Sequence, residues 1–129
     1  MIDRQASILV VGDGEVAERL SRDLGPERLT RFDRPYPALA EFARRPYEAL
    51  VLAWPMPELP ALARAFRRLR GSTRCYAVCT PAGEAELRLA GNGDLDDYFI
   101  HPVNRDELER IVTGPSPAEP GPAAPAPAV

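Results

Sequence analysis

The chain has 129 residues, 45% of them hydrophobic, which suits one ordinary globular domain with its own core. All sixteen basic residues are arginine, so lysine-dependent chemistry such as a Schiff base or a Walker-type phosphate site is excluded. Nineteen acidic residues bring the net charge to -3, which does not favour a nucleic-acid partner.

The sequence also carries no sign of a membrane segment or of a disulfide. No apolar run approaches 18 residues in length, and no charged and then apolar leader begins the chain, so we expect a cytoplasmic protein with no membrane partner. Cys75 and Cys79 are four residues apart in an apolar run. At that spacing on one strand they would be about 13 Å apart, too far for a disulfide, so we expect two core thiols.

Apolar runs and helical stripes alternate five times along the chain. A short continuous apolar run indicates a strand covered on both faces, and apolar residues three and four apart indicate the inner face of a helix. We predict strands at 7–11, 28–32, 49–53, 75–79 and 98–100. The first three helices should bury Val16, Leu20 and Leu24, then Leu39, Phe42 and Ala43, then Leu59, Leu62, Phe66 and Leu69. A fourth helix is expected at 82–90, and a fifth, capped by Asn104, should bury Leu108, Ile111 and Val112.

This alternation favours an α/β fold in which helices cover both faces of a parallel sheet, within a folded domain at residues 1–112. The composition changes after residue 112, where 113–129 is rich in proline and alanine and has no apolar stripe. We expect this segment to be a disordered tail or a linker, with a ligand for a proline-recognition module as the alternative.

In an open parallel sheet, chemistry takes place at the carboxyl ends of the strands. The residues predicted there are Gly12, Asp13, Gly14, Ala53, Trp54, Thr80, Pro81, His101 and Pro102. Ala53 ends a buried strand in the middle of this set. A methyl group cannot accept a phosphoryl group, coordinate a cation or take a proton. The sequence therefore indicates binding and no catalysis.

Together with Trp54-Pro-Met-Pro57, Ala90-Gly91 and Asp96-Asp-Tyr-Phe-Ile-His-Pro-Val103, this pattern resembles the receiver domain of bacterial response regulators. The resemblance spans residues 7–112. It implies a flavodoxin-like three-layer sandwich, with a five-stranded parallel sheet in the order 2-1-3-4-5. It also implies that the bond between His101 and Pro102 can be cis, and that residues 92–95 lengthen the loop before the fifth strand.

Carried over position by position, the resemblance implies a degenerate phosphorylation pocket. The acidic pair that holds Mg²⁺ in receivers reads Gly12 and Asp13 here, and the phosphoacceptor aspartate reads Ala53. One carboxylate offers too few oxygens for a hard dication, so we expect no metal and no cofactor. The switch hydroxyl is retained as Thr80, and His101, with its shorter reach, replaces the lysine of the family.

The function that the resemblance implies is that of a pseudo-receiver, a non-catalytic module that binds a protein partner without phosphorylation. The expected setting is a bacterial two-component or related regulatory pathway. By analogy, the partner surface lies on the fourth helix, fifth strand and fifth helix, with Leu87, Leu95, Tyr98 and Arg105 as candidate contacts. Tyr98 matches the aromatic residue that turns inward or outward in receivers. The same face could form a homodimer, and an effector domain could follow the tail.

Several of these residues also have a plainer interpretation. Asp13 can be a helix N-cap or a loop carboxylate, and His101 can be a polar loop residue before a turn proline. Arg64, Arg67 and Arg68 share one side of a helix, where they could contact an acidic partner or simply form its solvated face.

A nucleotide-binding domain is the alternative function. Residues 12–17 read G-x-G-x-x-A between a strand and a helix, and Asp33 follows about twenty residues after the loop. In a small Rossmann-like NAD(P) domain, the Gly12-Asp13-Gly14 loop would hold the pyrophosphate and Asp33 the ribose. Asp13 and Glu15 oppose this interpretation, because they place negative charge where phosphates would lie.

Overall fold

The computed structural model describes residues 7–25, 27–54, 58–90 and 94–114, in which five strands and five helices alternate along the chain. The strands are β1 (Ile8–Val11), β2 (Leu29–Phe32), β3 (Ala49–Ala53), β4 (Arg74–Cys79) and β5 (Asp97–Ile100). The helices are α1 (Glu15–Leu24), α2 (Pro35–Arg44), α3 (Leu59–Leu69), α4 (Pro81–Ala90) and α5 (Arg105–Thr113). None of these helices is long and apolar enough to cross a bilayer.

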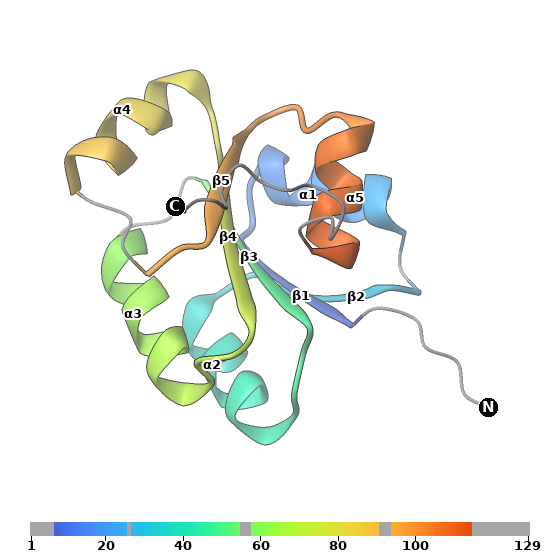
Figure 1. Ribbon diagram of the computed structural model, residues 1–129, viewed down its shortest axis with the longest axis vertical. Helices are drawn as coiled ribbons and strands as arrows, with labels where there is room; N and C mark the ends of the chain where they lie inside the picture. The colour runs from blue at the N-terminus through green and yellow to red at the C-terminus, as the bar shows by residue number, and fades with distance from the viewer. Residues whose placement is uncertain (1–6, 26, 55–57, 91–93, 115–129) are drawn as a thin grey trace, which may run out of the picture.

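The strands form one parallel sheet in the order β2-β1-β3-β4-β5, so the predicted flavodoxin-like α/β fold is confirmed. Helices α1 and α5 cover one face of this sheet, and α2, α3 and α4 cover the other (Figure 1). Because all strands run in the same direction, their carboxyl ends lie along a single edge. Every residue of the predicted pocket lies at one of these ends or directly after it.

Side chains of the strands alternate between two hydrophobic cores, one on each face of the sheet. The core under α2, α3 and α4 contains Leu9, Val11, Leu50, Leu52, Phe42, Leu62, Phe66 and Leu87. The core under α1 and α5 contains Ile8, Val10, Val51, Val78, Val16, Leu20, Phe99 and Ile111. All residues of β1 and β3 are buried, which explains their continuous apolar sequences.

Two predicted core positions are wrong, and both lie in the last turn of a helix. Leu69 ends α3 and is 45% exposed, and Ala43, next to the end of α2, is also exposed. In α2 the buried alanine is Ala38, one turn earlier. In both α2 and α3, the buried apolar side chains therefore end before the last turn of the helix is complete.

The predicted ends of the elements are correct to within one residue. Strands β1 and β2 each start one residue later than predicted, while β4, α4 and β5 each start one residue earlier. Helix α5 includes Thr113, and the Gly114 N–H donates to the carbonyl of Arg110 at 2.8 Å. The rest of the predicted tail, residues 115–129, lies outside the described residues.

Asn104 begins α5 with a reciprocal capping box, in agreement with its predicted role as a cap. Its Oδ1 accepts from the Glu107 N–H at 2.8 Å, and Glu107 Oε1 accepts from the Asn104 N–H at 3.1 Å. We expect Asn104→Ala to lower the free energy of unfolding by about 1 kcal/mol in urea denaturation. Asn104→Ser should retain most of that stability, and equal losses in both variants would contradict a capping role.

Candidate functional site

The carboxyl ends of β1 and β3 meet in a tight contact between Gly12 and Ala53, both of which are buried. A Cβ atom on Gly12 would lie 3.0 Å from the Cβ of Ala53 and 3.2 Å from its carbonyl oxygen. Gly12 also has a φ of +149°, a conformation that side chains of L-residues rarely adopt. The side chains at this point are therefore small, a methyl group on Ala53 and none on Gly12, and the backbone around Gly12 leaves little room for a larger one.

Asp13 lies beside this contact but is exposed to solvent. The N-cap of α1 is Gly14, and it makes no side-chain capping bond, so the interpretation of Asp13 as an N-cap is wrong. Asp13 is an exposed loop carboxylate. The described segments contain no group of three or more His, Cys, Asp or Glu side chains that could hold a metal ion. The residues at this edge therefore do not fit the Mg²⁺ that receivers bind, because that ion needs several oxygen ligands.

Thr80, at the end of β4, is engaged with the first turn of α4. Its Oγ1 accepts from the Gly83 N–H at 3.0 Å, and its carbonyl accepts from the Glu84 N–H at 2.9 Å. Pro81, which has no N–H to satisfy, occupies the first helical position. Thr80 thus acts as the N-cap of α4, a role that its sequence position before Pro81 could have indicated.

Trp54 lies directly against the same turn of α4. A Cβ atom added to Gly83 would come within 2.7 Å of Cε2, 2.8 Å of Cδ2 and 2.9 Å of Nε1 of the indole. The Trp54 N–H donates to the carbonyl of Val78 at 2.8 Å, which fixes the backbone of Trp54 beside β4. Only a glycine at position 83 allows the ring to lie this close, and no sequence pattern indicated this contact.

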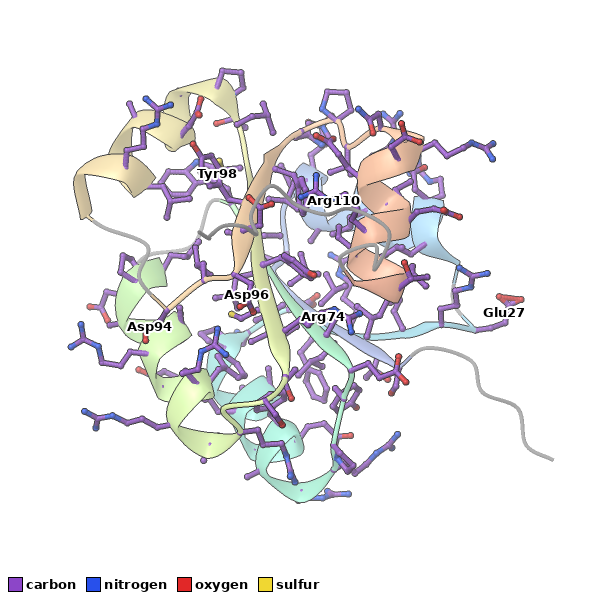
Figure 2. The ribbon with its side chains drawn as sticks, viewed as in Figure 1. Glu27, Arg74, Asp94, Asp96, Tyr98 and Arg110 are labelled. Carbon is purple, nitrogen blue, oxygen red and sulfur yellow. The ribbon has the colours of Figure 1, made fainter. Side chains whose placement is uncertain are left out.

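Tyr98, on β5, points toward α4 (Figure 2). Its hydroxyl donates to Glu84 Oε2 at 2.8 Å and accepts from Arg88 Nε at 3.3 Å, while Arg88 and Glu84 form an ion pair at 3.5 Å. These contacts hold the half-buried Tyr98 ring against the helix.

The other three candidate partner contacts differ in accessibility. Arg105 is exposed, and Leu95 is half-buried against the core under α2, α3 and α4. Leu87 is only 2% exposed and belongs to that core. The prediction that Leu87 lies on the partner surface is therefore wrong, because it occupies the inner face of α4.

His101 directly follows β5, and the two cysteines lie on β4. The His101 backbone N–H donates to the carbonyl of Cys79 at 2.8 Å, and the bond to Pro102 is cis, as the resemblance implied. Burial raises the pKa of the Cys75 thiol to about 12 and that of Cys79 to about 11. Both thiols stay protonated near neutral pH and are unsuited to nucleophilic chemistry.

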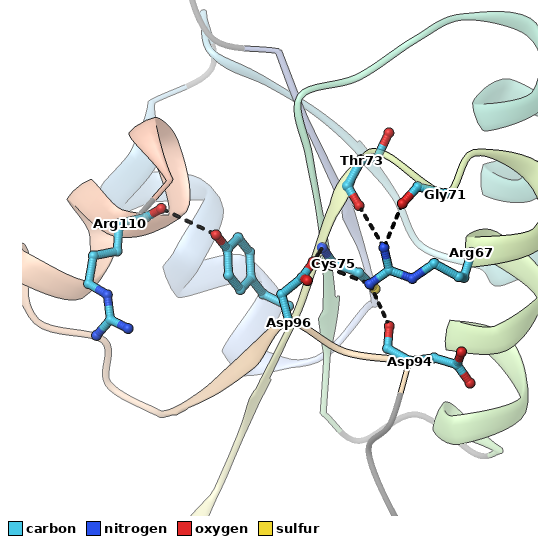
Figure 3. A network of polar contacts seen from close by, with 8 residues as sticks. Arg67, Gly71, Thr73, Cys75, Asp94, Asp96 and Arg110 are labelled. Carbon is cyan, nitrogen blue, oxygen red and sulfur yellow. Dashed lines mark hydrogen bonds and ion pairs between the residues drawn. The ribbon is translucent and has the colours of Figure 1, made fainter. Parts of the chain in front are cut away.

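Arg67 has a structural role that the sequence analysis missed. Its guanidinium donates to the carbonyls of Gly71 at 2.8 Å and Asp94 at 2.9 Å, and to the Asp96 carboxylate at 3.2 Å (Figure 3). The same Asp96 oxygen accepts from the Cys75 N–H at 2.7 Å. Arg67 thus joins α3, the turn before β4 and the segment before β5. The solvated-face interpretation does not apply to it, although neighbouring Arg68 is exposed.

The loop proposed to bind a nucleotide is surrounded by competing charges. Arg31 Nε donates to the Gly12 carbonyl at 3.3 Å and lies 3.6 Å from a carboxylate oxygen of Asp33. Glu15 and Glu18 occupy the first turn of α1, where a bound phosphate would meet them. The sheet order is also that of flavodoxin-like proteins, which differs from the order 3-2-1-4-5 of dinucleotide-binding domains.

Comparison with known proteins identifies the fold through structure alone. No protein-family model matches the chain, and no curated protein sequence does so at a significant level. A CheY-like response regulator receiver domain from Methanospirillum hungatei JF-1 matches with a TM-score of 0.68 and 22% identity, over 84% of this chain and 91% of that chain. A receiver domain protein from Clostridium thermocellum matches with a TM-score of 0.68 and 16% identity, over 83% and 90% of the two chains.

An adenylate cyclase from Rhodopirellula baltica is also similar, with a TM-score of 0.67 and 16% identity over 84% of this chain and 85% of that chain. The fold is therefore that of receiver domains. At identities of 16–22%, these likenesses do not carry chemistry from one protein to another, so a function can be inferred only from the residues of this chain.

Proposed function

We propose that this domain is a pseudo-receiver, a non-catalytic signalling module that binds a protein partner without being phosphorylated. The observation that carries the proposal is the contact between Gly12 and Ala53. Neither residue has a group that can hold a cation or accept a phosphoryl group. A carboxylate at position 12 would also strain the backbone, because a Cβ there would overlap Ala53 and the φ of Gly12 is unfavourable for L-residues.

The proposed partner surface is formed by α4, β5 and α5. These three elements carry six acidic side chains against three arginines, a net charge of -3. Among the described residues, the large hydrophobic side chains exposed to solvent are Tyr36 on α2 and Leu69 on α3, both outside this surface. A partner with a basic surface fits this charge.

A homodimer through α4, β5 and α5 is the alternative use of this surface, and the charge opposes it. A two-fold contact places the same patch on both subunits, so a net charge of -3 would face its own copy. We therefore favour a heteromeric partner, contacted by Tyr98, Arg105 and the exposed edge of Leu95. Analytical ultracentrifugation at low salt separates the two possibilities.

The biological setting proposed for this module is a bacterial two-component or related regulatory pathway in the cytoplasm. The support is the receiver fold together with the alanine at position 53, which offers no carboxylate for phosphotransfer. An effector domain beyond the proline-rich residues 115–129 would suit such a module, since an extended proline-rich segment is a semi-rigid spacer.

We expect that acetyl phosphate with Mg²⁺ will not label the domain, because no carboxylate occupies position 53. Intact-mass spectrometry should show no phosphoryl adduct, and fluorine NMR should show no bound beryllofluoride. A phosphorylatable receiver in the same reaction is the positive control. A stable adduct on any residue of the domain would overturn the proposal.

A further inference from the structure

We infer that the Trp54 indole acts as a latch that sets the position of α4, and through α4 the position of Tyr98. The inference rests on the proposed function, since Tyr98 belongs to the proposed partner surface. The contact between Trp54 and Gly83 connects the carboxyl end of β3 with that surface. It would hold the surface in one arrangement without any ligand in the pocket.

The described part of α4, residues 81–88, offers little apolar surface to hold the helix in place. Among its described side chains, at positions 81–88, only Leu87 is a buried hydrophobic group. With one buried hydrophobic side chain among these positions, the placement of the helix depends on its other contacts as well. One of these is the contact of the Trp54 ring with Gly83, which lies in the first turn of α4, close to where β4 ends.

The same turn of α4 carries the bond to Tyr98. The Gly83 N–H donates to Thr80, and Glu84, the next residue, accepts from the Tyr98 hydroxyl. One turn later, Arg88 donates to that hydroxyl, so two side chains of α4 contact Tyr98, which points at the helix in Figure 2. A shift of the first turn of α4 must therefore move or break the Tyr98 contacts.

Position 83 of the chain departs from helix preference. Alanine in a helix is more favourable than glycine by about 1 kcal/mol, so a glycine inside α4 has a local cost. Close approach of the indole accounts for it, because a methyl group would overlap three ring atoms at 2.7–2.9 Å. Gly71 provides a matched comparison, since a Cβ there would meet its nearest atom, the Arg67 carbonyl, at 3.7 Å.

The test is Gly83→Ala, with Gly71→Ala as the control. Trp54 is the single tryptophan, so its emission reports the contact directly. In Gly83→Ala we expect the emission to shift to longer wavelength, acrylamide quenching to increase, and the Tyr98 ring resonances to shift in NMR spectra. Gly71→Ala should leave all three unchanged. Circular dichroism verifies that each variant is folded.

Trp54→Phe tests the same coupling without adding a methyl group, because the smaller ring withdraws from Gly83. We expect it to shift the Tyr98 resonances, and Tyr98→Phe should in turn shift the Trp54 emission, because coupling is reciprocal. Unchanged Tyr98 resonances in both Gly83→Ala and Trp54→Phe would overturn the inference. Phosphoryl labelling would overturn the proposed function but leave this result intact, so the two failures are distinguishable.

Discussion

Ala53→Asp is expected to remain unlabelled by acetyl phosphate in Mg²⁺ and to unfold at a lower urea concentration than the wild-type domain. The new carboxylate would replace a side chain that is 1% exposed and would meet Gly12 at its base. A buried charge without a partner costs about 3 kcal/mol or more at pH 7. Restoring the acceptor therefore removes stability and does not restore the missing metal ligands.

The pH dependence of this variant has a definite sign. Burial disfavours the charged form, so it would raise the pKa of the carboxyl group that Ala53→Asp introduces above its unfolded value of about 3.9. Between these two pKa values the folded variant binds more protons than the unfolded chain, so its stability falls as the pH rises. The deficit relative to wild type should be smallest below about pH 4 and largest above the folded pKa.

Ala53→Asn is the matched control, because it adds nearly the same volume without a titrating group. It should share the steric part of the destabilisation and lack the additional pH dependence. Urea unfolding at several pH values separates the two effects. Labelling of Ala53→Asp by acetyl phosphate would show that the loss of phosphorylation depends on a single residue, contrary to the role we assign to Gly12.

The sheet could be predicted from the sequence because its central strands are buried on both faces. Such strands read as continuous apolar runs, as at Ile8–Val11 and Ala49–Ala53, and their alternation with helical stripes restricts the topology. The positions of Gly12 and Ala53 could be predicted for a similar reason, because Gly12 directly follows a strand and Ala53 ends one. The loss of phosphorylation that their residue types indicate stays a prediction.

The contacts that the sequence did not indicate join segments far apart in the chain. Trp54 meets Gly83 across 29 residues, and Arg67 reaches Asp96 across the same separation. The neighbouring sequence does not indicate either contact. A glycine in a helix and an arginine beside another arginine are both common without a long-range contact. The prediction for Leu87 was wrong for a different reason. The analogy with receivers placed Leu87 on the partner surface, whereas its side chain lies on the inner face of α4, in the core.

Arg67→Ala is expected to lower the free energy of unfolding by about 2 kcal/mol, a loss typical of removing charge-assisted hydrogen bonds from a half-buried site. The Arg67 side chain is 26% exposed, so solvent screens its ion pair with Asp96 only in part. The part-buried carbonyl of Asp94 would also lose its donor, whereas the exposed carbonyl of Gly71 can bond to water instead.

Arg68→Ala is the control, since Arg68 is the next residue of α3 and is exposed. A surface substitution of this kind should change stability by less than about 0.5 kcal/mol in urea unfolding. The free energy of unfolding of Arg67→Lys should lie between those of the two alanine variants. An ammonium group keeps the charge but cannot bond to several acceptors at once as a planar guanidinium does. Equal stability of the Arg67→Ala and Arg68→Ala variants would contradict the structural role of Arg67.

The pairing of Arg67 with Asp96 can be isolated in a double-mutant cycle. Asp96 also accepts from the Cys75 N–H, so Asp96→Ala should destabilise the domain even when Arg67 is absent. We expect the double variant to lose less stability than the sum of the single variants, by about 1 kcal/mol, because the two residues share one network. Amide exchange at Cys75 should accelerate more in Asp96→Ala than in Arg67→Ala, since the carboxylate holds that N–H directly. Additive losses would mean that Arg67 acts through the carbonyls of Gly71 and Asp94 alone.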